Sequence, residues 1–167
     1  MKKFFSIIAA LTMLLQFLTV AQSNSPSSAN NIQVAFPFYD DVEDTTASSS
    51  YWQRDVAVWK MQIANAHSGT MVWAMLLTTG SYNYLTLASD IDLSSTSNPY
   101  LSFWVRKADG GLGALSIEAS NNGGTSWTAV SQPSFNGALY IRFQIPLSNF
   151  RQANARVRIG CYAPYGS

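Results

Sequence analysis

Four stretches of this chain alternate apolar and polar residues with a period of two, and this pattern constrains the fold more than any other feature. In ALSIEAS (114–120), Leu115, Ile117 and Ala119 alternate with polar residues. The same alternation recurs in LSFWVRK (101–107), YIRFQIPL (140–147) and ARVRIGC (155–161). Because successive side chains of a strand point to opposite faces, each stretch predicts a strand with one buried face.

The remainder of the chain also indicates strands joined by turns. The runs MVWAMLL (71–77) and YLTLAS (84–89) predict strands that are buried more deeply. Segments rich in Gly, Ser and Asn separate the runs, and we expect no amphipathic helix beyond the N-terminal segment, with one turn at most in SNFRQANA (148–155). Short strands at regular spacing predict an all-β, two-sheet sandwich.

The N-terminal segment is predicted to be a secretory signal peptide over residues 1–22. Lys2 and Lys3 form a basic start, residues 4–20 are almost wholly apolar, and small residues for cleavage follow at 19–21. The apolar run is short for a membrane span, although a retained N-terminal anchor helix is the alternative. We expect a flexible polar leader over 23–34 and a single β-sandwich domain over 35–167.

Charge and cysteine content exclude several classes of protein. Without Lys2 and Lys3 the ten basic residues become eight, against nine acidic ones, so the exported chain would carry a net charge of about −1. This balance gives no indication of a nucleic-acid partner. Cys161 is the only cysteine, which rules out an intrachain disulfide, and its place on an apolar face predicts a buried, unreactive thiol.

The octet SNNGGTSW (120–127) nearly spells the Asp-box of sialidases, which reads Ser-x-Asp-x-Gly-x-Thr-Trp. Asn122 stands in place of the Asp and Ser126 in place of the Thr, and the motif occurs once in a chain too short for a propeller. Asn122, Gly123 and Gly124 can supply the positive φ angles of a tight hairpin. We therefore predict a hairpin turn, with Trp127 opening the return strand.

Six segments follow one another along the chain in a recognisable order: FPFYDDVED (36–44), WKMQIANAHSGT (59–70), LASDIDLSSTSNPYLSFWVRK (87–107), LSIEASNNGGTSW (115–127), RFQIPLSNF (142–150) and ARVRIGCYA (155–163). In this order they resemble the MAM-like jelly-roll modules of secreted bacterial proteins, including the cleaved-adhesin domains attached to gingipain-type proteases. The resemblance implies a two-sheet jelly-roll β-sandwich that is secreted or displayed on the bacterial cell surface. The family usually ends with a strand that carries an Asp pair, and we expect this last strand to be missing from the present chain.

An acidic run is the candidate metal site. Asp40, Asp41, Glu43 and Asp44 lie together, and in an extended strand Asp41 and Glu43 would share one face. Crowded carboxylates repel one another unless a cation bridges them, and oxygen ligands suit calcium. The resemblance implies structural Ca²⁺ at Asp41 and Glu43, together with the closing Asp pair. A solvated acidic edge is the alternative.

Aromatic residues are the candidate ligand-binding residues. Tyr82 and Tyr84 lie near a predicted loop tip, and Trp104 is on the polar face of its strand, so all three could stack on sugar rings. Alternatively, Trp104 fills the second face of a strand or packs under a loop. His67 is the only histidine and is interpreted as part of a turn, although a dyad with Ser68 is conceivable. The sequence has no H-E-x-x-H, G-x-S-x-G or P-loop pattern.

These features predict a secreted, non-catalytic binding or adhesion module that recognises protein or glycan surfaces and is stabilised by calcium. Two alternatives are an N-terminal accessory domain of a larger secreted peptidase or glycoside hydrolase, and a structural cell-surface spacer. We expect no nucleic-acid partner and no membrane span after signal cleavage. Further domains are expected C-terminal to Ser167.

Overall fold

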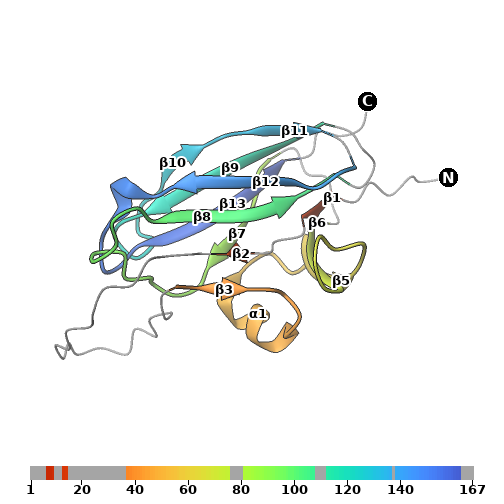
Figure 1. The fold of residues 1–167 in the computed structure, drawn as a ribbon, viewed down its shortest axis with the longest axis horizontal. Helices are drawn as coiled ribbons and strands as arrows, with labels where there is room; N and C mark the ends of the chain where they lie inside the picture. The colour runs from red at the N-terminus through yellow and green to blue at the C-terminus, as the bar shows by residue number, and fades with distance from the viewer. Residues whose placement is uncertain are drawn as a thin grey trace.

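The computed structural model describes residues 7–9, 13–14, 37–75, 81–107, 112–136 and 138–162, so the predicted leader at 23–34 lies outside the described residues. It confirms an all-β protein of antiparallel sheets, with one short helix (Figure 1). The elements are β1 Ile7–Ala9, β2 Met13–Leu14, β3 Tyr39–Asp40, α1 Thr45–Tyr51, β4 Trp52–Gln53, β5 Trp59–Ile63, β6 Met71–Met75, β7 Asn83–Leu87, β8 Tyr100–Val105, β9 Leu112–Ser120, β10 Thr128–Ser131, β11 Ser134–Asn136, β12 Ile141–Pro146, the 3-10 helix η1 Ser148–Phe150 and β13 Arg156–Tyr162.

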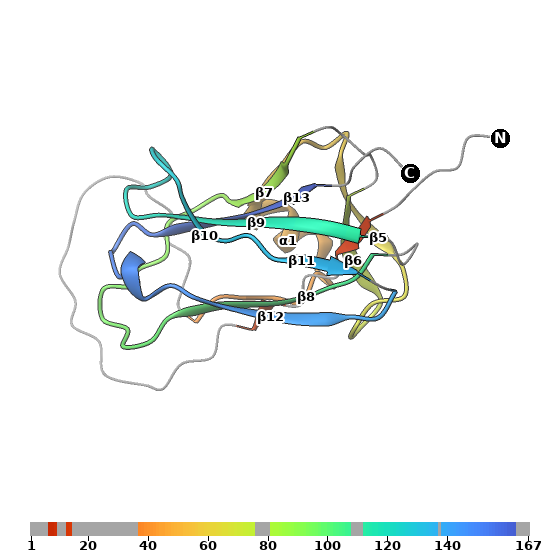
Figure 2. The ribbon, with the colours of Figure 1, turned by 90° about the horizontal axis from the view of Figure 1, so that it is seen from above.

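The largest sheet has six strands in the order β10-β9-β13-β7-β4, with β11 also pairing with β9. Its centre is the β9–β13 pair, in which Ile117 lies opposite Ile159. A second layer contains the β8–β12 ribbon, in which Phe103 lies opposite Phe143 (Figure 2). The strands β5 and β6 pair with each other at one end of the molecule.

The core lies between these layers and is built from the residues that the alternation predicts. Side chains of both layers meet where Phe103 and Val105 of β8 approach Leu115 of β9 and Ile159 of β13. Two of the predicted inward residues, Ile141 and Phe143, are partly buried and pack against this core. The other predicted inward residues are buried: Leu101, Phe103, Val105, Leu115, Ile117, Ala119, Ile145, Leu147, Val157, Ile159 and Cys161. Trp59 and Trp73 join the same core from β5 and β6.

The octet at 120–127 forms the predicted hairpin turn between β9 and β10. Gly123 and Gly124 have φ angles of 67° and 85°, in the left-handed region that favours glycine. The Asn122 side chain closes the turn, since its Oδ1 accepts a hydrogen bond from the Ser126 amide at 3.0 Å. Trp127 directly precedes β10, as expected from the sequence.

The helix α1 was not predicted from the sequence, which led us to expect no amphipathic helix after the N-terminal segment. Asp44 is its N-cap and accepts hydrogen bonds from the amides of Thr46 and Ala47. The sequence TTASSSY has no apolar periodicity, and Ser48 is the buried residue of the helix. Hydrophobic patterning therefore gave no signal for α1. The single turn expected within 148–155 is present as η1.

The strands β1 and β2 come from the segment predicted to be a signal peptide. β6 lies between β1 and β5 and pairs with both of them. β2 pairs with β3 and lies beside β8. The pairing on one edge of β6 therefore comes from residues that signal cleavage would remove. Among the described residues, no helix is both long and apolar enough to cross a membrane.

We predict that backbone amides of residues 73–75 exchange with solvent several-fold faster in a chain that begins at residue 23 than in the full chain. Removing β1 leaves one edge of β6 without its partner, and each hydrogen bond lost there is worth about 1 kcal/mol. Hydrogen exchange followed by mass spectrometry measures the difference. The amides of β13, which lies between β7 and β9, serve as the internal control. Equal exchange at 73–75 in both chains would contradict the prediction.

Candidate functional site

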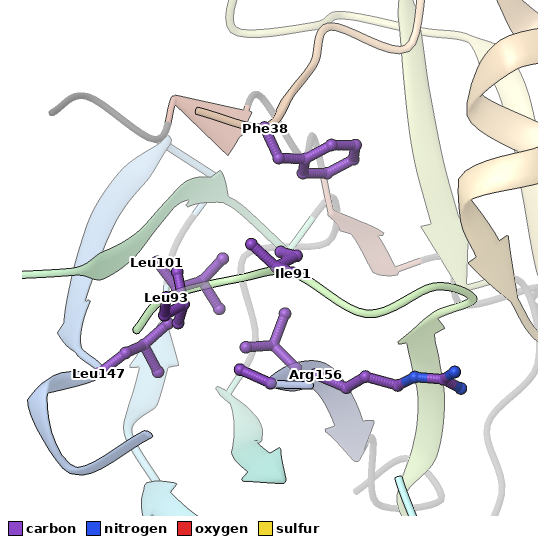
Figure 3. A pocket seen from close by; sticks show the side chains of 8 residues that line it. Phe38, Ile91, Leu93, Leu101, Leu147 and Arg156 are labelled. Carbon is purple, nitrogen blue, oxygen red and sulfur yellow. The ribbon is translucent and has the colours of Figure 1, made fainter. Parts of the chain in front are cut away.

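Two voids among the described residues are too small to hold a ligand. One void of about 10 Å³ lies among apolar side chains, and Figure 3 shows Phe38, Ile91 and the neighbouring leucines around it. The aliphatic part of Arg156 lines the same void, while its guanidinium extends away and pairs with Asp90. A space of this size holds one water molecule at most. A binding site formed by the described residues must therefore lie on the outer surface.

The acidic run does not form the extended strand that the sequence predicts. β3 ends at Asp40, and Val42 has a φ angle of 68°, which turns the chain. The Asp40 carboxylate is buried, with 4% exposure, and accepts hydrogen bonds from the Val42 amide, the Ser48 hydroxyl and the Trp52 indole N–H. Asp40 is thus a structural acceptor that joins β3, α1 and β4.

Asp41 and Glu43, the predicted calcium ligands, also accept hydrogen bonds from the backbone. Asp41 Oδ1 accepts from the Glu43 amide at 3.0 Å. Glu43 accepts from the amides of Met71 and Thr70 at 2.8 and 2.7 Å and from the Thr70 hydroxyl at 2.8 Å. These bonds lower the pKa of Glu43, the Met71 amide most of all.

Glu43 thereby anchors the turn that contains His67. Gly69 has a φ angle of 69°, and a Cβ atom there would lie 2.3 Å from Glu43 Oε1, so the close approach requires glycine. Across the residues that the structure describes, no three His, Cys, Asp or Glu side chains gather in a way that could hold a metal ion. Calcium binding at Asp41 and Glu43 stays a prediction.

We predict that Glu43→Gln lowers the midpoint of thermal unfolding at neutral pH, and that its difference from wild type shrinks as the pH falls. The folded-state pKa of Glu43 is depressed, so the carboxylate contributes stability above its unfolded-state pKa and loses it as the pH falls through the folded pKa. Calorimetric scans from neutral to strongly acidic pH measure this, with exposed Lys60→Gln as the control. A difference that is constant with pH would show that the charge is not involved.

The outer face of the six-stranded sheet carries Tyr82, Tyr84, Glu118, Arg158 and Tyr162, which we call the tyrosine surface. The Tyr84 hydroxyl donates to Glu118 Oε1 at 2.6 Å, and the Arg158 guanidinium donates to Glu118 Oε2. The Arg158 guanidinium also lies 4.1 Å from the centre of the Tyr84 ring. Tyr82 lies beside Tyr84 and Tyr162, with ring centres 6.4 and 5.7 Å apart.

The polar side chains of the tyrosine surface form hydrogen bonds with one another. Burial alone would raise the pKa of Glu118, but the hydrogen bonds from Tyr84, Arg158 and Ser116 together lower it. The other face of Tyr84 rests on Gly160, where an added Cβ would lie 2.7 Å from Tyr84 Cε1. Tyr84 is thus held between the strand and Arg158, and its ring faces are already in contact with protein.

The outer face of the β8–β12 ribbon carries His67, Trp104, Arg106, Tyr140 and Arg142, which we call the tryptophan surface. The His67 ring stacks on Trp104 with ring centres 3.8 Å apart and planes 14° apart, and Tyr140 meets His67 edge-on at 5.6 Å. The Arg106 guanidinium lies 5.3 Å from the centre of the Tyr140 ring. Arg142 is directly opposite Trp104 in the β-pairing.

Contacts from several segments hold the tryptophan surface in place. The Tyr140 hydroxyl donates to the Asn65 carbonyl at 2.6 Å, which ties the segment before β12 to the His67 turn. The Tyr140 ring also packs on Val72 and Ala74, the residues of β6 that face away from the main core. His67 is exposed, so its ring is the solvent-side layer of the stack on Trp104.

The structure separates the aromatic residues that the sequence analysis grouped together. Trp104 lies on the β8–β12 ribbon, whereas Tyr82 and Tyr84 lie on the outer face of the six-stranded sheet. His67, Arg106, Tyr140 and Arg142 were not predicted to bind a ligand. The alternation of β8 and β12 already placed Arg106 and Arg142 on the face of Trp104, and this signal could have identified them.

Cys161 is buried as predicted. Its thiol is fully enclosed, and burial raises its pKa to about 12, which keeps it protonated at neutral pH. It is therefore no candidate for a nucleophile.

No known protein family, no curated protein and no solved structure matches this chain. The resemblance to MAM-like modules stays a prediction from the sequence. The function is accordingly inferred from the chain's own side chains and their arrangement.

Proposed function

We propose that this protein is a secreted, non-catalytic binding module of the MAM-like jelly-roll type, which recognises protein or glycan surfaces through the tryptophan surface. It would act as an adhesin on the bacterial cell surface, or as an accessory domain linked to further domains after Ser167. The observation that carries the proposal is the outward-facing stack of Trp104 and His67, with Tyr140 edge-on beside it.

The chemistry of this surface suits the face of a sugar ring. Aromatic rings offer a flat apolar area to the C–H face of a sugar, and the neighbouring Arg106 and Arg142 offer N–H donors to its oxygen atoms. Trp104 and Arg142 project from paired strands, and strands position side chains more precisely than loops do. The surface therefore has an aromatic platform, whose solvent-side ring is His67 of the turn, and a strand-borne arginine, Arg142, beside it.

The tyrosine surface is a weaker candidate because its groups are already paired. Glu118 accepts hydrogen bonds from Tyr84 and Arg158, and both faces of the Tyr84 ring are in contact with protein. A ligand there would have to replace these contacts. Tyr82 and Tyr162 offer partly exposed rings, so binding at Tyr82 and Tyr84 remains the second proposal for the ligand site.

We predict that Trp104→Ala weakens glycan or matrix-protein binding at least tenfold, while Tyr82→Ala leaves it within about twofold. Tenfold corresponds to about 1.4 kcal/mol, the scale expected when a stacking platform is removed. The measurement is a glycan and matrix-protein array probed with the protein, followed by titration of each hit. A loss with Tyr82→Ala alone would move the site to the tyrosine surface. A blank array with the wild-type protein would favour the structural spacer.

We further propose that calcium stabilises the module at Asp41 and Glu43. Both side chains are exposed, and a carboxylate has lone pairs beyond those that accept the backbone hydrogen bonds described above. The fit is partial, because no group of three or more His, Cys, Asp or Glu side chains gathers among the described residues, and calcium takes six or more oxygen ligands.

We predict that millimolar calcium raises the midpoint of thermal unfolding relative to chelator, and that Asp41→Asn abolishes this rise. An ion that binds the folded state alone stabilises it by mass action. Differential scanning calorimetry measures the shift, and Asp55→Asn is a matched control at another exposed carboxylate. Identical midpoints in calcium and chelator would exclude the calcium site.

A further inference from the structure

We infer that the tryptophan surface selects anionic polysaccharides built from carboxylated sugars. This inference rests on the proposed function of that surface as a glycan site, and adds the charge of the ligand. It follows from the charges of β8 and β12, from the Arg106 nitrogen that has no hydrogen-bond acceptor, and from the position of the His67 and Tyr140 rings.

The strand positions around Trp104 carry positive charge and no carboxylate. On this face of β8, Ser102 and Arg106 flank Trp104, and on β12 the register places Arg142 opposite Trp104 and Gln144 opposite Ser102. Facing residues of paired strands have Cβ atoms about 5 Å apart, so Arg142 lies beside Trp104, while the Arg106 guanidinium lies over the Tyr140 ring. The outer face of the ribbon therefore presents two cations beside an aromatic platform.

Among the residues that the structure describes, neither of these arginines pairs with a carboxylate. Within the described parts of the chain, ion pairs join Arg156 to Asp90 and Arg158 to Glu118. Arg142 is exposed and its Nε donates to the neutral hydroxyl of Ser102 at 3.0 Å. The Arg158 guanidinium on the tyrosine surface is neutralised within the protein, whereas the exposed Arg142 guanidinium on the tryptophan surface is available to an external anion.

Arg106 supplies a second, independent indication. Its Nε is buried and has no hydrogen-bond acceptor. A buried donor without an acceptor is unfavourable, and a guanidinium fork matches the two oxygens of a carboxylate. A ligand carboxylate at the rim of the stack would reach this nitrogen only if the partly buried Arg106 side chain turned outward to meet it. The carboxylate of Glu43 does not fill this role, because it accepts hydrogen bonds from Thr70 and Met71 beyond the His67 turn.

The combination of rings and charge decides the class of ligand. The exposed His67 ring and the edge of Tyr140 form an aromatic layer that a small inorganic anion would leave uncovered. A neutral sugar would cover the rings but leave both arginines without a counter-charge. A uronic acid carries an apolar ring face and a carboxylate on the same ring, so it meets both requirements.

The test compares the full chain's affinity for polygalacturonate and alginate with its affinity for fully methyl-esterified polygalacturonate, which keeps the ring and removes the charge. Calorimetric titrations are made in chelator, so that calcium does not cross-link the polymers. We expect at least about tenfold weaker binding of the ester, and affinity for the acidic polymers that falls as salt is raised. Dextran sulfate is the probe for charge attraction alone, and we expect it to bind at least about tenfold more weakly.

Variants separate the charge from the platform. R142Q and R106Q should each weaken binding of the acidic polymers about tenfold and leave the ester unchanged, whereas W104A should weaken both. R151Q, at an exposed arginine after η1 and outside the surface, is the matched control. Since Arg142 is exposed, R142Q provides the test even where R106Q disturbs folding.

Three results would overturn the inference. Equal binding of acid and ester, with no effect of R142Q, would leave a glycan site without charge selection. Equal binding of dextran sulfate would reduce the interaction to charge attraction. Absence of binding to both carboxylated polymers, while W104A still impairs binding of neutral glycans or matrix proteins, would refute the ligand class and leave the proposed function standing. If W104A impaired binding of no ligand, the proposed function would fail as well.

Discussion

The layers of this protein depend on one shared apolar core, since its only cysteine cannot form an intrachain disulfide. Phe103 and Val105 from one layer meet Leu115 and Ile159 from the other, and burying each large side chain contributes about 1.5–3 kcal/mol. Each strand must keep its apolar residues on the inner face for this core to form. The polar and charged residues between them are thereby directed to the two outer faces, where the candidate sites lie.

The buried carboxylate of Asp40 is the main polar exception within this core. A buried charge is tolerated only when hydrogen-bonded, and Asp40 accepts from Val42, Ser48 and the Trp52 indole. These bonds connect β3 and the turn after it to α1 and β4. The acidic residues after Asp40 also stabilise local structure. Asp44 caps α1, and Glu43 accepts hydrogen bonds from the turn that carries His67. The acidic run thus positions the loop of the tryptophan surface.

The two outer faces differ in how their charges are balanced, and this difference supports the proposed division of roles. On the six-stranded sheet, Arg158 is neutralised by Glu118 and covers Tyr84, so the surface stabilises itself. On the β8–β12 ribbon, Arg106 and Arg142 have no carboxylate partner within the described parts of the chain, and the aromatic stack ends in an exposed ring. Arginines that lie unpaired beside aromatic rings suit a ligand that supplies both an anionic group for the arginines and an apolar face for the rings.

The sequence by itself determined which residues face inward in β8, β9, β12 and β13, because a period of two is a local property of a strand. It also determined the hairpin at Gly123 and Gly124, where the turn requires positive φ. It did not reveal α1, whose cap and buried Ser48 depend on neighbouring carboxylates and not on an apolar pattern. Only the tertiary structure decided that Tyr82 and Trp104 lie on different sheets and that His67 stacks on Trp104. Those contacts join segments far apart in the chain, and strand periodicity carries no information about which strands become neighbours.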